Sequence, residues 1–314
     1  MKETVVVGSR GSKLALQQTR LVMARLRKQA PGTTFQLQVI RTQGDKILDV
    51  ALSKIGDKGL FVKEIETALL EGTIDLAVHS MKDVPTAIPE GLELGALLKR
   101  SDPRDVLVSP HACTLAELPA GARVGTGSLR RIAQLAAAYP HLRFEPVRGN
   151  LDTRLQKMER GEYAALILAY AGLERLGWLE RVAEVLPLET CLPAVGQGAL
   201  GVEIRSGDER LKKRVASLDD LPTRLAVTAE RSFLRYLEGG CQVPLGALGT
   251  LRGANTLRLE GMIASLDGGT LLRDTEEGPA REAREIGVRL AQKLLARGAG
   301  AILEEVRRHC DAWE

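Results

Sequence analysis

The segment VKEIETALLEGTIDLAV, residues 62–78, joins two different sequence patterns. Val62, Ile65 and Leu69 recur at the spacing of one helix face, and Gly72 ends that pattern. Ile74–Val78 follows at once and is typical of a buried strand. A helix that leads directly into a buried strand predicts an α/β protein, in which right-handed crossovers build a parallel sheet.

The same alternation continues on both sides of this segment. On the N-terminal side we expect a strand at Thr4–Val7, a helix over Ser12–Lys28 and a strand through Phe35, Leu37 and Val39. On the C-terminal side a second unit repeats the order strand, helix, strand, helix, strand. Its expected elements are Arg123–Gly125, Ser128–Tyr139, Leu142–Val147, Leu151–Arg160 and Tyr163–Ala169.

The last third of the chain has another pattern. Short hairpin-linked strands are expected at Gln242–Thr250, Leu257–Ala264 and Leu271–Arg273, and helices at Ala280–Ala296 and Ala301–His309. Near Cys191–Ile204 the chain is extended again, as if it returned to the first unit. We therefore predict three domains: residues 1–99 with 200–217 (α/β), residues 104–193 (α/β) and residues 221–314 (a small α+β domain).

Composition excludes several classes of protein. The 314 residues are 44% hydrophobic and 27% charged, as in ordinary globular proteins, so a disordered or fibrous chain is excluded. No apolar run approaches the roughly 18 residues of a membrane span, and Met1–Thr4 runs into Val5–Val7 without a signal segment. A net charge of +4 with 3% aromatic residues does not indicate a nucleic-acid surface. We expect a cytoplasmic protein that binds neither membranes nor nucleic acid.

Neither a zinc site nor a dinucleotide site is predicted. The four cysteines form no C-x-x-C pair and the four histidines lack ligand spacing, so no metal is expected. Gly196-Gln197-Gly198-Ala199-Leu200-Gly201 matches G-x-G-x-x-G, but a loop precedes it and the strand-like Val202–Ile204 follows it. A glycine-rich hinge or a close backbone approach explains it better than a dinucleotide fingerprint.

Two turns between a strand and a helix have the composition of anion sites. Gly8-Ser9-Arg10-Gly11-Ser12 is the first, and Gly125-Thr126-Gly127-Ser128, followed by Arg130 and Arg131, is the second. Each combines helix N-terminal N–H groups with hydroxyls and guanidinium groups. A capped helix with solvated arginines explains either turn alone equally well. Two such turns, one in each unit, favour an anionic ligand shared between the units.

More cations lie near ends of the predicted strands and helices. Arg148, Arg154 and Arg175 follow this pattern, as does the segment from Lys54 through Lys58 to Phe61. One surface arginine indicates nothing. Many of them at such positions indicate a ligand with several carboxylates or phosphates, because guanidinium groups pair with both.

Lys82 and Asp83 follow the predicted strand Ile74–Val78, at the edge where α/β active sites form. The carboxylate there could act as a general acid or base or stabilise a cation. A turn aspartate before Pro85 is slightly favoured on this pattern alone. His79 is interpreted as a packed, hydrogen-bonded histidine rather than a catalyst.

The loop Glu238-Gly239-Gly240-Cys241-Gln242-Val243-Pro244 presents a cysteine between glycines and a proline. A buried inert thiol is the ordinary state of a lone cysteine. The glycines and the proline instead indicate a shaped, exposed loop, where a covalent attachment site or a nucleophile is plausible. Cys113, Cys191 and Cys310 lack such surroundings and are interpreted as inert.

Together these motifs resemble the porphobilinogen deaminase (hydroxymethylbilane synthase) family over nearly the whole chain and in the family's order. The stretches that carry the resemblance are residues 9–16, 58–64, 75–85, 127–131, 148–150, 153–155, 192–200 and 239–241.

The resemblance implies a transferase of tetrapyrrole (porphyrin and haem) biosynthesis. Such an enzyme condenses four porphobilinogen molecules stepwise into linear hydroxymethylbilane and releases ammonia at each step. A dipyrromethane cofactor, bound as a thioether, is the primer. The implied fold resembles type II periplasmic binding proteins, with two hinged α/β domains facing a cleft and a third domain with the cofactor loop. The hinge would pass through residues 99–104 and 193–200, and the protein would be a monomer.

The resemblance also implies roles for particular residues. Cys241 matches the attachment residue and Asp83 the catalytic aspartate, with Lys82 beside it. The residues that match the binders of cofactor and substrate carboxylates are Arg10, Lys82, Thr126, Ser128, Arg130, Arg131, Arg148, Arg154 and Arg175. The supporting residues of the cleft would be Ser12, Lys54, Lys58, Phe61 and Gln197.

A two-domain anion-binding protein without catalysis is the alternative. The two α/β units and the anion turns fit it equally well, but the Cys241 loop and the third domain do not. The intact mass of the purified protein distinguishes the two, because only the enzyme carries a covalent pyrrole adduct.

Overall fold

A computed structural model describes residues 4–46, 59–111, 113–238, 243–253 and 255–311. The chain divides into two compact units. Unit 1 contains the described residues of 1–48, 59–101 and 198–224, and unit 2 those of 102–197 and 225–314. Among the described residues, the chain thus passes between units at Ser101–Asp102, at Gln197–Gly198 and at Arg224–Leu225. The three domains with the bounds given above stay a prediction.

Unit 1 contains a five-stranded sheet in the order β2-β1-β3-β10-β4. Its strands are β1 (Thr4–Arg10), β2 (Thr34–Ile40), β3 (Leu76–Ser80), β4 (Leu92–Leu97) and β10 (Leu200–Arg205). Its helices are α1 (Lys13–Gln29), α2 (Gln43–Lys46), α3 (Lys63–Leu70) and α7 (Glu209–Ala216), with a short 3-10 turn, η2, at Met81–Asp83.

The N-terminal helix α1 forms where its sequence pattern predicts it. The Ser12 hydroxyl accepts a hydrogen bond from the Ala15 N–H at 3.2 Å and so satisfies one of the helix's unpaired N-terminal donors. Val22, Met23 and Leu26 form the buried face of α1 and belong to the core that also contains strands β1 and β3. The helix thereby fixes the position of the short connection that follows Arg10, the last residue of β1.

The prediction of a parallel sheet is wrong for one part of unit 1. β1 runs parallel to β2 and β3, but β10 runs antiparallel to both β3 and β4. The chain re-enters unit 1 beside the end of β3, because Leu200 pairs with Ser80 and the Met81 N–H donates to the Ala199 carbonyl at 3.0 Å. A strand that begins where its neighbour ends must run in the opposite direction.

Unit 2 contains a second five-stranded sheet, in the order β7-β6-β8-β5-β9. Its strands are β5 (Asp105–Val108), β6 (Arg123–Gly125), β7 (Arg143–Glu145), β8 (Ala165–Ala169) and β9 (Val182–Val185). Its helices are α4 (Leu129–Ala138), α5 (Leu151–Glu159) and α6 (Tyr170–Leu176), with 3-10 turns η3 (Leu115–Glu117) and η4 (Leu179–Arg181). β6 is parallel to β7 and β8, and β5 is antiparallel to β8 and β9.

Both sheets therefore have the same strand order. In each, the first strand of the βαβαβ pattern lies between the second and the third. The strand that follows a passage between units, β10 or β5, then lies antiparallel beside the third strand. The predicted pair of α/β units is confirmed, with this one antiparallel strand as the feature that the periodicity does not indicate.

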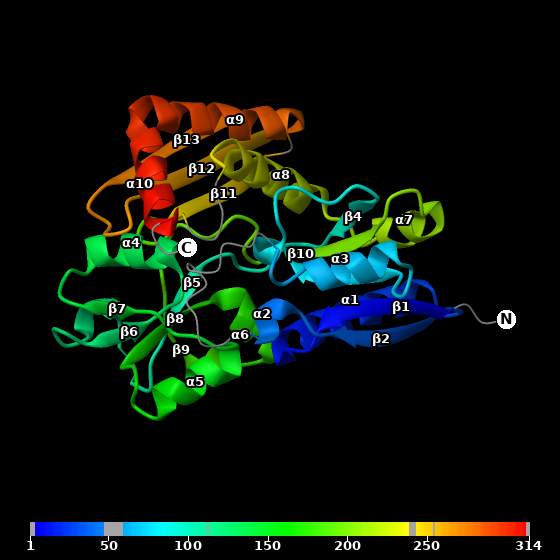
Figure 1. Ribbon diagram of the computed structural model, residues 1–314, viewed down its shortest axis with the longest axis horizontal. Coiled ribbons are helices and arrows are strands. Elements are labelled where there is room, and N and C mark those ends of the chain that lie inside the picture. Colours follow the sequence, from blue (N-terminus) through cyan, green and yellow to red (C-terminus); the bar gives the residue numbers. More distant parts are fainter. Residues whose placement is uncertain (1–3, 47–58, 112, 239–242, 254, 312–314) are drawn as a thin grey trace. The chain divides into compact units, whose positions relative to one another are not determined.

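The C-terminal part of unit 2 is the predicted α+β structure (Figure 1). Strands β11 (Leu245–Arg252), β12 (Thr256–Ala264) and β13 (Leu271–Pro279) form an antiparallel sheet. Its helices are α8 (Leu221–Tyr236, which belongs to unit 2 from Leu225 on), α9 (Ala283–Leu294) and α10 (Gly300–Asp311), with the turns η5 (Ala280–Glu282) and η6 (Leu295–Ala299). A Cβ on Gly261 of β12 would lie 2.8 Å from Phe233 of α8 and 2.9 Å from Leu290 of α9. Both helices therefore pack on the same face of this sheet.

The glycine motif at residues 196–201 is confirmed as a site of tight backbone geometry. Gly196 and Gly198 have φ of 72° and 88°, a region that favours glycine. Gly201 lies so close to Met81 that a Cβ there would overlap the Met81 sulfur. Strand β10 follows the motif where a dinucleotide site would need a helix, so the rejection of that site is confirmed.

Candidate active site

In unit 1 the predicted site residues lie at the carboxyl ends of two neighbouring parallel strands. Arg10 ends β1, and its guanidinium carbon lies 4.1 Å from the centre of the Phe61 ring, within cation–π range. Lys82 and Asp83 follow β3 directly. Because β1 and β3 pair in parallel, these groups share one edge of the sheet. Lys54 and Lys58 lie outside the described residues.

The turn that holds Asp83 is anchored on both sides. Met81 and Val84 are buried, with 1% and 6% of their surface exposed, whereas Lys82 and Asp83 are exposed. The Met81 N–H is also bonded to the Ala199 carbonyl, on the neighbouring segment. Asp83 thus lies in a short turn whose backbone is anchored, and its carboxylate is at the surface; whether it acts in catalysis stays a prediction.

In unit 2 the predicted residues also follow the parallel strands. Thr126 comes directly after β6, Arg148 lies between β7 and α5, and Arg175 lies in the last turn of α6, the helix after β8. Arg154 on α5 donates from Nε to the Gly149 carbonyl at 2.8 Å. Partial burial lowers the pKa of Arg148, because burial disfavours the charged guanidinium.

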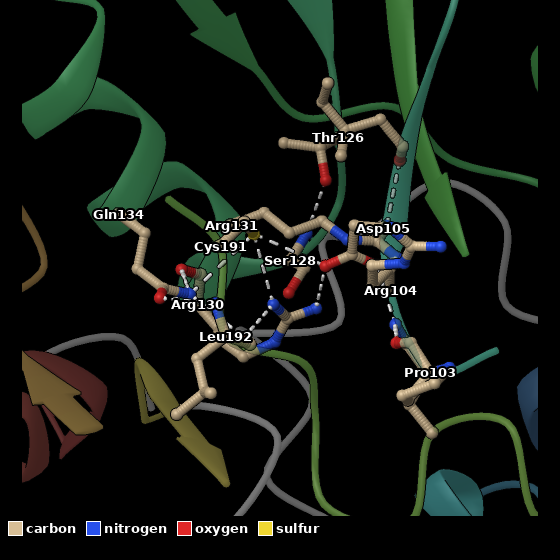
Figure 2. Close-up of polar contacts among 12 residues, drawn as sticks. Pro103, Arg104, Asp105, Thr126, Ser128, Arg130, Arg131, Gln134, Cys191 and Leu192 are labelled. Atoms are coloured by element: carbon tan, nitrogen blue, oxygen red, sulfur yellow. Dashed lines mark hydrogen bonds and ion pairs between the residues drawn. The ribbon is translucent and has the colours of Figure 1, made fainter. Parts of the chain in front are cut away.

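Arg130 and Arg131 lie in the first turn of α4, after Ser128, and share one buried carboxylate (Figure 2). Arg130 Nη2 donates to Asp105 Oδ2 at 2.8 Å, and Arg131 Nη2 donates to Asp105 Oδ1 at 2.6 Å. Their exposed fractions are 4% and 5%, and Asp105 is completely buried. The expected cleft arginines are therefore held inside the unit rather than extended into solvent.

The electrostatics of this cluster depend on the pair of arginines. Burial by itself would raise the pKa of Asp105, but the charges of Arg130 and then Arg131 hold that pKa well below its usual range. Burial, together with Asp105, raises the pKa of the Cys191 thiol to about 12. Cys191 is thus a protonated, inert thiol, as its sequence surroundings indicate.

Gln197 belongs to the same cluster. Its Nε2 donates to the Pro103 carbonyl at 2.7 Å and to Asp105 Oδ1 at 2.8 Å, and only 1% of its surface is exposed. The amide therefore links two segments of unit 2, one that follows the passage at Ser101–Asp102 and one that ends at the passage Gln197–Gly198, to the arginine cluster. A role of Gln197 at the cleft surface stays a prediction.

His79 is packed as predicted. Its Nε2 lies 2.9 Å from Glu203 Oε2, and the exposed fractions of the two residues are 5% and 0%. Glu66 belongs to this buried group, and its pKa is raised to about 6, chiefly by burial and also by the charge of Glu203, while His79 opposes the shift. His79 lies on β3, the strand that leads into the turn of Asp83, whereas Glu203 lies on β10 and Glu66 on α3.

Asp105 and Gln134 are site residues that the sequence patterns did not identify. Gln134 accepts from the Leu192 N–H at 2.8 Å and donates to the Leu192 carbonyl at 3.2 Å, while Arg130 donates to the same carbonyl at 2.6 Å. One signal was available for Asp105: a carboxylate starts the wholly apolar run Val106-Leu107-Val108. A charged residue at such a buried strand needs a partner.

Cys241 lies outside the described residues, so its attachment role stays a prediction. No described helix has both the length and the apolar character needed to cross a membrane. Within the described ranges, no three histidine, cysteine or acidic side chains come together as metal ligands.

Comparisons with known proteins identify the family. A family model described as "Porphobilinogen deaminase, dipyromethane cofactor binding domain" matches residues 5–213, and the C-terminal domain model of that family matches residues 224–296. Porphobilinogen deaminase of Moorella thermoacetica is 58% identical over 96% of this chain and 96% of its own. That of Carboxydothermus hydrogenoformans is 53% identical over 98% and 99%.

Among solved structures, the periplasmic aliphatic sulphonate binding protein SsuA of Escherichia coli covers 76% of this chain and 71% of its own. Its identity is 16% and its TM-score 0.39. The two family matches and the near-complete coverage of the relatives decide the identity. The chain belongs to the porphobilinogen deaminase family, whose members condense porphobilinogen stepwise into hydroxymethylbilane on a dipyrromethane cofactor, a step of tetrapyrrole biosynthesis.

Proposed function

We propose that Asp83 is the catalytic carboxylate of this condensation and that Lys82 assists it. The supporting observation is the exposed carboxylate on a short turn anchored by buried Met81 and Val84. A pyrrole presents an N–H donor and develops positive charge as ammonia leaves. A carboxylate in a fixed place can accept the N–H and stabilise the cation without reorganising during the reaction.

The arginines bind the acidic groups of the pyrroles. Each pyrrole has an acetate and a propionate, so a growing chain needs many cationic partners. The proposed carboxylate binders are Arg10, Lys82, Thr126, Ser128, Arg130, Arg131, Arg148, Arg154 and Arg175. Ser12, Lys54, Lys58, Phe61 and Gln197 are proposed to support them.

The cluster around Arg130 fits a group that bears carboxylates. Two guanidinium groups share the single carboxylate of Asp105, so one positive charge remains uncompensated within the cluster. The Nε atoms of Arg130 and Arg131 are buried and have no hydrogen-bond partner among the described residues. Such a group favours an additional anion, because a buried uncompensated charge is costly.

Cys241 is proposed to hold the dipyrromethane cofactor through a thioether. In the sequence, Cys241 follows two glycines, a residue type that tolerates the backbone conformations of a shaped loop. When bound, the cofactor supplies the terminal pyrrole to which the next porphobilinogen is joined. The protein is further proposed to act as a cytoplasmic monomer without a nucleic-acid or membrane partner.

The direct test substitutes Asp83. Asp83→Asn keeps the size of the side chain, removes its charge and replaces one acceptor oxygen by a donor. Asp83→Glu keeps the charge but moves it by about one methylene, and a misplacement of about 1 Å can reduce a rate on the order of a hundredfold. We expect both variants to fold and both to be slow, with Asp83→Asn the slower.

The measurement is single-turnover release of ammonia by variants that are shown to be folded and loaded with cofactor. Loading is checked by intact mass, so a defect in cofactor assembly is not mistaken for a defect in chemistry. Near-normal release of ammonia by Asp83→Asn would show that Asp83 only shapes the turn after β3 and has no part in catalysis.

A further inference from the structure

The carboxylate of Asp105 is the common hydrogen-bond acceptor of Arg130, Arg131 and Gln197. It begins β5, is completely buried, and its two oxygens have different partners. Oδ2 accepts from Arg130 and Oδ1 accepts from both Arg131 and Gln197. One carboxylate therefore fixes the two guanidinium groups relative to each other (Figure 2).

The second anchor of each guanidinium group is a neutral backbone carbonyl. Arg130 Nη1 donates to the Leu192 carbonyl at 2.6 Å, and Arg131 Nη1 donates to the Ile167 carbonyl at 2.8 Å. Each group is thus held at both terminal nitrogens. Only Asp105 contributes a negative charge to these contacts, so the cluster stays positive overall.

Asp105 therefore both positions the two guanidinium groups and partly neutralises their charge. Without the carboxylate of Asp105, two buried cations would lie side by side on α4 with carbonyls, an amide and a thiol around them. Their mutual repulsion in a buried setting would turn the guanidinium groups away from each other. With it, both stay in one geometry, and the remaining positive charge is already desolvated before a ligand arrives.

We propose that Asp105 is a positioning residue for the reaction: it holds Arg130 and Arg131 in the arrangement that binds a carboxylate of the pyrrole chain. This inference rests on the proposed function of the two arginines. Preorganised charges bind more tightly because the ligand does not have to order them. Asp105 itself contacts neither substrate nor cofactor.

The experiment compares holoenzymes of the parent chain, Asp105→Asn and Asp105→Glu. Glu230→Gln is the matched control. Glu230 is a completely buried carboxylate of the same unit, and it accepts from the N–H groups of Gly196 and Gly249. The readouts are cofactor occupancy by intact mass, KM and kcat for porphobilinogen, and the midpoint of thermal unfolding.

We expect Asp105→Asn to raise KM about tenfold to a hundredfold, the factor that corresponds to one lost charge-assisted interaction, and to lower cofactor occupancy. kcat of the loaded fraction should change less than KM. Asp105→Glu should be more stable to heat than Asp105→Asn, because it keeps the charge. Its KM should still exceed that of the parent, because the longer side chain displaces the guanidinium groups. Glu230→Gln should lose stability with KM within about twofold of the parent.

Several outcomes would overturn the inference. A KM of Asp105→Asn that equals the KM of Glu230→Gln would show that the carboxylate serves stability alone. Should Asp105→Asn not fold, Asp105→Glu decides, and a parental KM in that variant would refute positioning. Arg130→Leu and Arg131→Leu distinguish a failure of the proposed function of the arginines from a failure of the proposed role of Asp105. If neither changes KM or loading, the proposed function of the arginines fails; if both do and Asp105→Asn does not, only the role of Asp105 fails.

Discussion

The buried carboxyl of Glu66 should make the stability of this protein depend on pH in a defined direction. Only 9% of Glu66 is exposed, and its Oε1 has no hydrogen-bond partner among the described residues. Burial and the nearby Glu203 raise its pKa from 4.5 to about 6, although His79 opposes the shift. The folded protein therefore holds the Glu66 proton more tightly than the unfolded chain does.

The size and sign of the effect follow from this difference. The rise of the Glu66 pKa from 4.5 to about 6 corresponds to a loss of roughly 2 kcal/mol in the free energy of unfolding once the carboxyl is ionised in both states. Below pH 4.5 the carboxyl is protonated in both states and the cost is absent. As the pH rises through about 6, the folded protein must bury a charge, and the full cost reduces the free energy of unfolding.

Glu66→Gln removes the ionisable group and retains the shape. We expect the variant to be more stable than the parent by about 1–2 kcal/mol at pH 8, with the difference falling towards zero near pH 4.5. The assay is urea denaturation of both proteins between pH 4.5 and 8, followed by circular dichroism. Glu90→Gln is the control, because it makes the same chemical change at an exposed position of unit 1.

Two outcomes would contradict this reasoning. A difference between Glu66→Gln and the parent that does not vary with pH would show that the ionisation of Glu66 is not coupled to folding. A variant that is less stable than the parent at pH 8 would show that the Glu66 carboxylate makes a favourable buried contact that outweighs its desolvation.

Two further predictions concern the cofactor and its binders. The native protein should have a mass excess of two linked pyrroles that Cys241→Ser lacks, and the variant should be inactive; intact mass and peptide mapping check this, and an adduct on another cysteine would refute the assignment. Arg130→Leu and Arg148→Leu should each impair loading or elongation, because a charge-assisted hydrogen bond contributes roughly 1.5–3 kcal/mol. Arg281→Leu, at an exposed position of the C-terminal part, should be nearly neutral in the same assays, and equal effects in all three would contradict the proposed binding roles.

Local sequence pattern was sufficient for most of the α/β elements. The predicted strand Arg123–Gly125 coincides with β6, and the helix predicted over Ser12–Lys28 differs from α1 by one residue at each end. Periodicity, capping residues and glycine or proline stops act within a few residues, so they can be recognised without knowledge of the fold. The family motifs are local in the same sense, which is why Asp83 and Cys241 could be singled out from sequence.

Elements without a strong local pattern were not predicted. β4, β5, α7 and α8 were among them. β5 has only four residues, and its apolar part gives no periodicity. α8 begins at Leu221 with Pro222 in its first turn, a position where proline is compatible with a helix but is easily taken for a turn signal.

Only the tertiary structure decided how distant residues meet. The direction of β10 depends on where the chain re-enters unit 1, and no periodicity records that position. Asp105 meets Arg130 and Gln197 across 25 and 92 residues of chain, and His79 meets Glu203 across 124. A sequence pattern shows which residues prefer burial or carry charge, but the partner of a buried charge is set by the packing of the whole unit. The sequence therefore determined the family, most of the α/β elements and the chemical types at the site, whereas the pairing of two expected cleft arginines with a buried aspartate was decided by the fold.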